Sequence, residues 1–239
     1  MTHSLVPATI AVVIPCYNEA AAIAMVIAQW REALPQAEVV VFDNNSTDGT
    51  GTIARELGVR VVEVPDQGKG HAVRAIFATL ADCDAVVLVD GDGTYPADRV
   101  GPLLALVLGG HADMTVGARR PLEGAGAMAP IRGLGNVLIR GAFRLLIGRA
   151  PGDLLSGYRV FNRRFLQSVR LRSRGFEVET ELTSEAIVRG MRVVEVPVTY
   201  HPRIAGTASK LRAVRDGVRI LAMIARQGMR LRLNRGSDG

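Results

Sequence analysis

Ala85-Val86-Val87-Leu88-Val89-Asp90-Gly91-Asp92 is the stretch of this sequence that decides its fold. Its five apolar residues in a row predict a strand that is buried on both faces of a parallel sheet. The two aspartates follow directly, so they leave the sheet at the carboxyl end of that strand. Two carboxylates so close repel each other unless a cation or hydrogen bonds neutralise them. A site for Mg²⁺ or Mn²⁺ is therefore predicted there, with the alternative that both aspartates are ordinary turn residues.

Similar strands precede this one along the chain. Predicted strands at 10–14, 39–42 and 59–64 each lead into a segment with helical character. Alternating strands and helices predict right-handed βαβ units, in which ligands bind beyond the carboxyl ends of the strands. Two further polar clusters stand at those ends, Pro15-Cys16-Tyr17-Asn18-Glu19 and Asp43-Asn44-Asn45-Ser46. The sequence therefore predicts an α/β protein with a mostly parallel, Rossmann-like sheet flanked by helices.

Length and composition are typical of one globular domain. The chain has 239 residues, of which 48% are hydrophobic and 22% charged, so it can bury a full core. We expect a single domain over residues 1–230 and a mobile polar tail over 231–239. Cys16 and Cys83 are the only cysteines, which indicates reduced thiols in a cytoplasmic protein. We see no signal peptide, and no apolar run reaches the ~20 residues of a spanning helix.

The charge balance predicts an anionic partner. The net charge is +6 and the pI is about 10.0, but aromatic residues make up only 5% and do not alternate with basic ones, which argues against nucleic acid. Two apolar segments, 131–149 and 211–227, carry regularly spaced arginines and predict amphipathic basic helices. They either pack on the core with their arginines in water or lie along an anionic bilayer surface. The second arrangement places the protein at the cytoplasmic face of a membrane.

The strand-end motifs resemble those of family 2 glycosyltransferases, which have the GT-A fold. The stretches that carry this resemblance are Ile14–Glu19, Asp43–Thr50, Gly68–Gly70 and Asp90–Pro96, in the order seen in that family. Later stretches are similar to those of polyprenyl-phosphate hexose synthases, such as dolichol-phosphate mannose synthase. They are Gly117–Arg119, Ser156–Phe161, Gly175–Glu181 and Arg203–Leu211.

The resemblance implies a role for each matching residue. Asp90 and Asp92 would hold Mg²⁺ or Mn²⁺ on the donor diphosphate, and Asp92 and Arg119 would be catalytic. The nucleotide pocket would be lined by Pro15, Tyr17, Glu19, Asp43, Asn44, Lys69 and Asp90. Arg119 and Arg132 would meet the acceptor phosphate with Asn136 one helical turn along, and Arg203, Ser209 and Lys210 would close a loop over the diphosphate. Lys69 has a plain alternative as a solvated charge at a helix start.

These observations predict an inverting, metal-dependent glycosyltransferase that moves a hexose from a GDP- or UDP-linked donor to a polyprenyl phosphate. A phosphate acceptor is largely dianionic at neutral pH and needs no general base. A soluble hydroxyl acceptor is the alternative, and it needs a base, for which Asp153 is the best candidate. A more distant alternative is a phosphatase with Asp90 as the nucleophile. Besides donor and acceptor, the expected partners are the membrane surface and a separate membrane protein.

In one acidic segment, the sequence does not show which glutamates point into the protein. Glu177, Glu179 and Glu181 alternate along a predicted helix over 177–189, so they cannot all share one helical face. We expect Glu181 to point inward and at least one of the three to be an ordinary surface charge.

Overall fold

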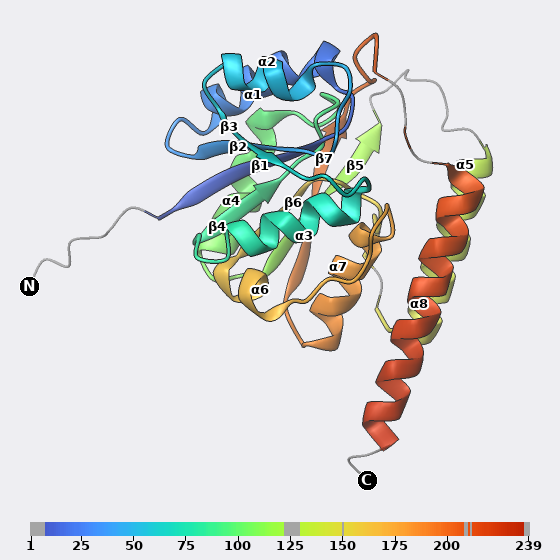
Figure 1. Ribbon diagram of the computed structural model, residues 1–239. Helices are drawn as coiled ribbons and strands as arrows, with labels where there is room; N and C mark the ends of the chain where they lie inside the picture. Colours follow the sequence, from blue (N-terminus) through green and yellow to red (C-terminus); the bar gives the residue numbers. More distant parts are fainter. Residues whose placement is uncertain (1–7, 122–129, 150, 208–209, 211, 237–239) are drawn as a thin grey trace, which may run out of the picture.

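The computed structural model describes residues 8–121, 130–149, 151–207, 210 and 212–236. Its centre is a seven-stranded sheet in the order β3-β2-β1-β4-β6-β5-β7 (Figure 1). The strands are β1 (Ile10–Cys16), β2 (Glu38–Asp43), β3 (Arg60–Glu63), β4 (Ala85–Leu88), β5 (Met114–Pro121), β6 (Arg159–Asn162) and β7 (Val193–Tyr200). Strand β6 runs antiparallel to β4 and β5, and the other pairs are parallel. The predicted mostly parallel sheet is confirmed.

Helices cover both faces of the sheet, which is why the central strands β1, β2 and β4 are rich in continuous apolar runs. On one face Val12 and Ile14 pack with α1 (Ala20–Ala33), α2 (Thr50–Glu56) and α4 (Val100–Leu108), the last preceded by a 3₁₀ turn at Ala97–Arg99. On the other face Ala11 and Val13 pack with α3 (Lys69–Thr79), α6 (Arg163–Ser168) and α7 (Val178–Val188). Successive residues of β1 thus enter opposite cores, as the period of a strand requires.

Two long helices form a separate layer beside the sheet. Helix α5 (Pro130–Leu146) and helix α8 (Ala213–Gly236) share a small apolar core that contains Ile139, Phe143, Ile220 and Ile224 (Figure 1). Both predicted amphipathic helices are therefore present. The expectation of a mobile tail from residue 231 is wrong for residues 231–236, because α8 continues to Gly236 and Leu231 packs against this core. Residues 237–239 lie outside the described part of the chain.

No described helix is long and apolar enough to cross a membrane.

Candidate functional site

The three predicted polar clusters meet at the carboxyl edge of the sheet. Strands β2, β1 and β4 are neighbours there, with Cys16 in register with Asp43. Burial raises the pKa of the Cys16 thiol, and the charges of the carboxylates around it, which come from Glu19, Asp43, Asp90 and Asp92, raise it further. Acidic groups from three separate loops therefore surround one buried point. Their convergence was predicted from the sequence, because carboxyl ends of parallel strands share one edge.

The carboxylate oxygens of the acidic pair after β4, Asp90 and Asp92, have different partners. Asp92 Oδ1 accepts hydrogen bonds from the Thr94 backbone N–H at 3.1 Å and from Thr94 Oγ1 at 2.7 Å. Its Oδ2 lies 2.5 Å from Arg203 Nη1. Asp90 Oδ1 lies 2.5 Å from Lys69 Nζ, and its carboxylate packs on the backbone of Gly157, where an added Cβ would come within 2.2 Å of Oδ2. Asp92 is buried, whereas the Asp90 side chain keeps a quarter of its surface exposed, at 25%.

Lys69 is not a solvated helix-start charge. Its Nζ lies between Asp90 and Glu179, 2.6 Å from Glu179 Oε1, and only 12% of the side chain is exposed. Burial lowers the pKa of Lys69, but the charges of Asp90 and Glu179 outweigh burial and leave it raised. Glu179 is a site residue that the sequence did not reveal.

The expectation of an exposed glutamate in this segment is wrong. Glu177, Glu179 and Glu181 are all buried, because α7 is covered on every side from Val178 to Ala186. Glu181, predicted to point inward, accepts hydrogen bonds from the backbone N–H groups of Arg172 and Ser173. Glu177 does the same for Arg174 and Gly175. Both carboxylates therefore shape the segment that leads into α7.

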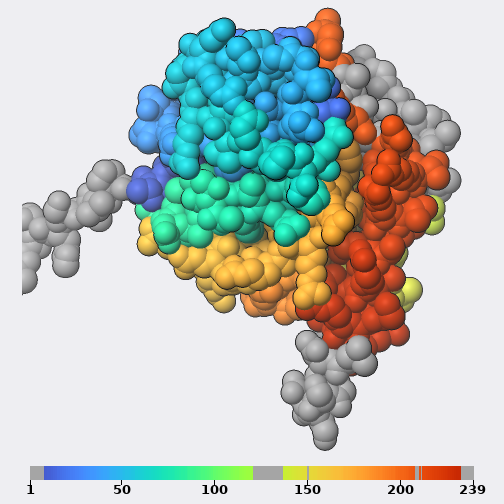
Figure 2. All heavy atoms as spheres, in the orientation of Figure 1, coloured from blue at the N-terminus to red at the C-terminus, as the bar shows by residue number. Residues whose placement is uncertain are grey.

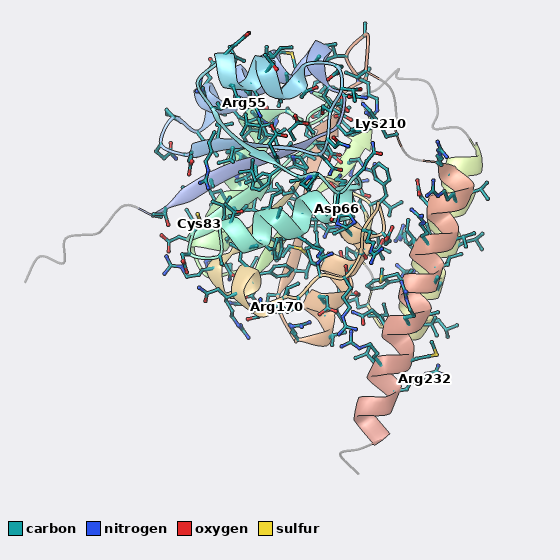
Figure 3. The ribbon with its side chains drawn as sticks, in the orientation of Figure 1. Arg55, Asp66, Cys83, Arg170, Lys210 and Arg232 are labelled. Carbon is teal, nitrogen blue, oxygen red and sulfur yellow. The ribbon has the colours of Figure 1, made fainter. Side chains whose placement is uncertain are left out.

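A basic loop, of which residues 201–207 and 210 are described, contacts the acidic pair and the residues around it. Its Arg203 pairs with Asp92, and its Lys210, labelled in Figure 3, places Nζ 2.6 Å from Glu19 Oε1 and 3.0 Å from the Asn18 carbonyl oxygen. The His201 N–H donates to the Thr94 carbonyl at 2.9 Å. Burial raises the pKa of Glu19, and Lys210 only partly opposes this. Ser209 of the same loop lies outside the described residues.

The end of β2 forms the wall next to this loop. Asn44 is buried, and its amide is fully used: Nδ2 donates to the carbonyls of Val64 and Asp66, and Oδ1 accepts from the Gly68 N–H at 2.6 Å. Asn44 therefore fixes the segment before Lys69, and neither of its N–H donors is free in this structure to read a base. Asp43 Oδ1 accepts from the Ser46 N–H at 3.1 Å. Pro15 and Tyr17, both half-buried, complete this edge.

Arg119, at the end of β5, is held by Asp153. Its Nε and Nη2 each lie 2.7 Å from an oxygen of that carboxylate, and its guanidinium stands 5.5 Å from the centre of the Tyr200 ring. Burial raises the pKa of Asp153, but the hydrogen bonds and charge of Arg119 outweigh it and leave the pKa below its usual value. Asp153 also accepts from the Leu155 N–H. Arg132 and Asn136 belong to α5, but their side chains lie outside the described set.

The oxygen ligands at this edge fit a hard divalent cation. Asp90 and Asp92 supply carboxylates, and the buried Glu19 Oε2 beside them has no hydrogen-bond partner. Among the described residues, no three His, Cys, Asp or Glu side chains gather closely enough to bind a metal alone. Substrate oxygens would therefore have to complete the coordination, as they do for Mg²⁺ and Mn²⁺ in diphosphate chemistry.

An α/β sheet with an acidic pair at its carboxyl edge is typical of nucleotide-sugar transferases with the GT-A fold. The chain belongs to glycosyl transferase family 2, whose profile matches residues 11–167. It is therefore a glycosyltransferase.

Three curated relatives show how far the similarity extends. The chain is 38% identical to glycosyltransferase AglJ of Haloferax volcanii over 88% of this chain and 69% of that protein. It is 35% identical to the dolichyl-phosphate hexose transferase of the same organism, over 83% of this chain and 85% of that protein. The polyprenol monophosphomannose synthase of Mycolicibacterium smegmatis is 32% identical over 94% and 88%. These similarities cover nearly all of the chain.

Solved structures show the same fold. Glucosyl-3-phosphoglycerate synthase from Mycobacterium tuberculosis in complex with UDP has a TM-score of 0.72 and 26% identity, over 93% of this chain and 80% of that one. The same enzyme with Mn²⁺, UDP and glucosyl-3-phosphoglycerate has a TM-score of 0.68 and 26% identity, over 96% and 80%.

Proposed function

We propose that this glycosyltransferase moves a hexose from a nucleotide diphosphate to a polyprenyl phosphate, with inversion at the sugar and with Mg²⁺ or Mn²⁺ at Asp90 and Asp92. The names of two relatives, a polyprenol monophosphomannose synthase and a dolichyl-phosphate hexose transferase, support the lipid acceptor. Structures of a fold neighbour with UDP and Mn²⁺ support the donor and the metal. The single observation that carries the proposal is the Arg119–Asp153 pair.

That pair separates the two acceptor classes. A hydroxyl acceptor needs a base, and Asp153 was the best candidate, but Arg119 occupies both of its oxygens and lowers its pKa. A carboxylate bound in this way is a poor proton acceptor. Arg119 in turn is fixed with its guanidinium partly exposed, at 26% of the side chain. A fixed arginine suits a phosphate, since its planar fork donates parallel hydrogen bonds.

The reaction then balances without a proton transfer. An oxygen of the acceptor phosphate forms the new bond to the anomeric carbon, and the bond from that carbon to the donor diphosphate breaks with its electron pair leaving on the diphosphate. Attack from the opposite side inverts the anomeric carbon. Arg203, which pairs with Asp92, and Lys210, which pairs with Glu19, would meet the diphosphate charge. A divalent ion, when bound, offsets the rest of that charge.

A second apolar face on the α5–α8 layer supports an acceptor held in a bilayer. Helix α8 buries Ile220, Met223 and Ile224 against the protein, yet Val214, Val218, Leu221 and Met229 are exposed along another side. On α5, Val137, Leu138 and Leu145 are exposed too. Seven of the eleven exposed large hydrophobic residues of the described chain thus lie on these two helices. Figure 2 shows α8, in red, forming one side of the surface.

Arginines run beside this apolar face. Arg215, Arg219, Arg226 and Arg230 are exposed and follow one another at helical spacing along α8. Asp216, the sole acidic residue in the sequence of the two helices, is buried. An apolar stripe bordered by cations fits an anionic membrane surface. Peripheral attachment there would bring a lipid-borne phosphate to the protein.

The direct test is incubation with labelled UDP- and GDP-hexoses, Mg²⁺ or Mn²⁺, and a short polyprenyl phosphate in vesicles. We expect an acid-labile, lipid-linked sugar with one of the donors and none in EDTA. Product formed only on a soluble acceptor such as 3-phosphoglycerate would instead establish the hydroxyl alternative. No lipid product with any donor would overturn the proposal. Family membership displaces the other alternative, a phosphatase with Asp90 as nucleophile.

A further inference from the structure

Asp90, Lys69 and Glu179 form a row of three charges that runs from the acidic pair into the protein. Lys69 Nζ lies 2.5 Å from Asp90 Oδ1 and 2.6 Å from Glu179 Oε1. The exposed fraction falls along the row, from 25% for Asp90 through 12% for Lys69 to 4% for Glu179. We propose that Glu179 is a positioning residue that acts through Lys69 to hold Asp90 in place and aimed at the metal–nucleotide complex. This inference rests on the proposed function.

If Lys69 were not also paired with Glu179, it would weaken the attraction of Asp90 for a metal ion. A lysine that belonged to Asp90 alone would neutralise it, and a divalent cation would then meet little attraction. Glu179 shares the ammonium, so the formal charges of the three groups sum to one negative charge. The shared lysine also holds Asp90 Oδ1, while Gly157 packs against the carboxylate from another side. Asp90 is thereby fixed in place from two sides.

A purely structural role explains Glu179 less well. Burying a carboxylate lowers stability unless its oxygens are all satisfied, and Glu179 Oε2 has no hydrogen-bond partner. Glu177 Oε2 has no partner either, but Glu177 and Glu181 on the same helix each accept two or more backbone hydrogen bonds and shape the segment before α7. Glu179 accepts no hydrogen bond from the described backbone of another residue, and its side-chain partner is Lys69. Its charge also acts on the buried Arg159, but its direct contact runs through Lys69 to the acidic pair.

The test is a Mn²⁺ titration of the whole chain with saturating UDP, and separately GDP, followed by electron paramagnetic resonance. Neither probe carries a sugar, so a direct contact between Glu179 and a sugar cannot produce the effect. We expect Glu179→Gln to weaken Mn²⁺ binding about tenfold, at the low end of what residues supporting metal ligands contribute. Nucleotide binding in EDTA should not change. The matched control is Glu185→Gln on the same helix, which loses a buried carboxylate paired with Arg189 and Gln227 instead.

A second variant separates action through Lys69 from any other route. In a Lys69→Met background no ammonium remains to be shared, so adding Glu179→Gln should cost no further Mn²⁺ affinity. A further tenfold loss there, or an unchanged affinity in Glu179→Gln alone, would overturn the inference. Thermal melting identifies variants that do not fold, and Glu179→Gln is nearly isosteric.

The outcomes also separate this inference from the proposed function. If lipid-linked product never forms but Mn²⁺ affinity falls as expected, the acceptor assignment alone is wrong. If the wild-type chain binds no Mn²⁺ with either nucleotide, the metal assignment and this inference are both overturned.

Discussion

Asp92 uses its two oxygens for different purposes. Oδ1 caps the turn at Thr94, and Oδ2 faces the cation of Arg203. An amide in its place would keep the acceptor for Thr94 but lose the negative charge. The turn at Thr94 and the proposed metal site therefore depend on different atoms of one side chain, which makes them separable by mutation.

Asp92→Asn should retain the fold and lower glycosyl transfer by roughly a hundredfold or more, because the charge that balances a cation on the diphosphate is gone. Turnover with labelled donor and the melting temperature are measured together. Asp98→Asn, an exposed carboxylate a few residues along, is the control and should behave like the wild type. Near-normal transfer by Asp92→Asn would contradict the metal assignment.

The Arg119–Asp153 pair makes a prediction about pH. The folded-state pKa of Asp153 lies below its unfolded value, so the pair contributes stability above the unfolded pKa of about 3.9 and loses it as the pH falls through the folded value. Asp153→Asn should destabilise the protein by about 2 kcal/mol at pH 7, somewhat less than a fully buried pair. Urea unfolding should show this difference shrinking below about pH 4. A difference that stayed constant across that range would contradict the assignment.

Among the elements, the strands at the centre of the sheet were predictable and β6 was not. Strands β1, β2 and β4 are continuous apolar runs, and the sheet buries them on both faces. Strand β6 contains Arg159, which reads as a surface residue but is fully buried. Its guanidinium donates to the carbonyls of Ser156 and Leu154 and to Thr183, and burial lowers its pKa to about 10. Those partners are tertiary contacts, which no local pattern reveals.

The candidate site also contains residues that the sequence could predict and residues that it could not. The acidic pair and the polar ends of β1 and β2 were predicted because chain position alone brings them to one edge. Glu179 was missed because the alternation argument assumes a helix with an exposed face, and α7 has none near its start. The partnership of Arg119 with Asp153 spans 34 residues of sequence. A pairing of that kind follows from the topology rather than from spacing.

Two glycines of α8 make opposite predictions. A Cβ at Gly228 would lie 2.9 Å from Leu146 Cβ and 3.0 Å from its carbonyl oxygen, whereas one at Gly217 would meet nothing within 4 Å. Gly228→Ala should therefore wedge α5 from α8 and destabilise by about 1–3 kcal/mol. Gly217→Ala should stabilise by about 0.5–1 kcal/mol, as glycine in a helix interior is unfavourable. Urea unfolding of both variants checks the close contact, and equal effects would contradict it.

At the scale of the whole molecule, the exposed stripe of α8 gives the protein a distinct side. Its arginines extend along the helix toward Arg232, near the end that reaches past the sheet (Figure 3). Leu108 at the end of α4 is also an exposed apolar residue, at 44%, but it belongs to the layer on the sheet itself. Val218 on α8 and Leu108 on α4 are both exposed apolar residues, so they can be compared as matched sites on the two surfaces.

Val218→Asp should weaken binding to vesicles that contain phosphatidylglycerol by about tenfold or more, since burying one valine contributes about 1.5 kcal/mol. Flotation with and without phosphatidylglycerol measures this, and added salt should reduce binding because the arginines are screened. Leu108→Asp is the control and should bind as the wild type does. Equal flotation of all three proteins would contradict the membrane side.

Ion pairs join the basic loop to Glu19 and Asp92. They affect the order in which metal and nucleotide bind. With Arg203 beside Asp92, a bare divalent ion meets a like charge, whereas a nucleotide offers the arginine a new anionic partner. We therefore expect Arg203→Ala to have opposite effects under two conditions. Mn²⁺ should bind this variant more tightly than wild type when no nucleotide is present and less tightly when UDP or GDP is. The enzyme would then bind its metal mainly as a complex with the nucleotide donor and only weakly as a free ion.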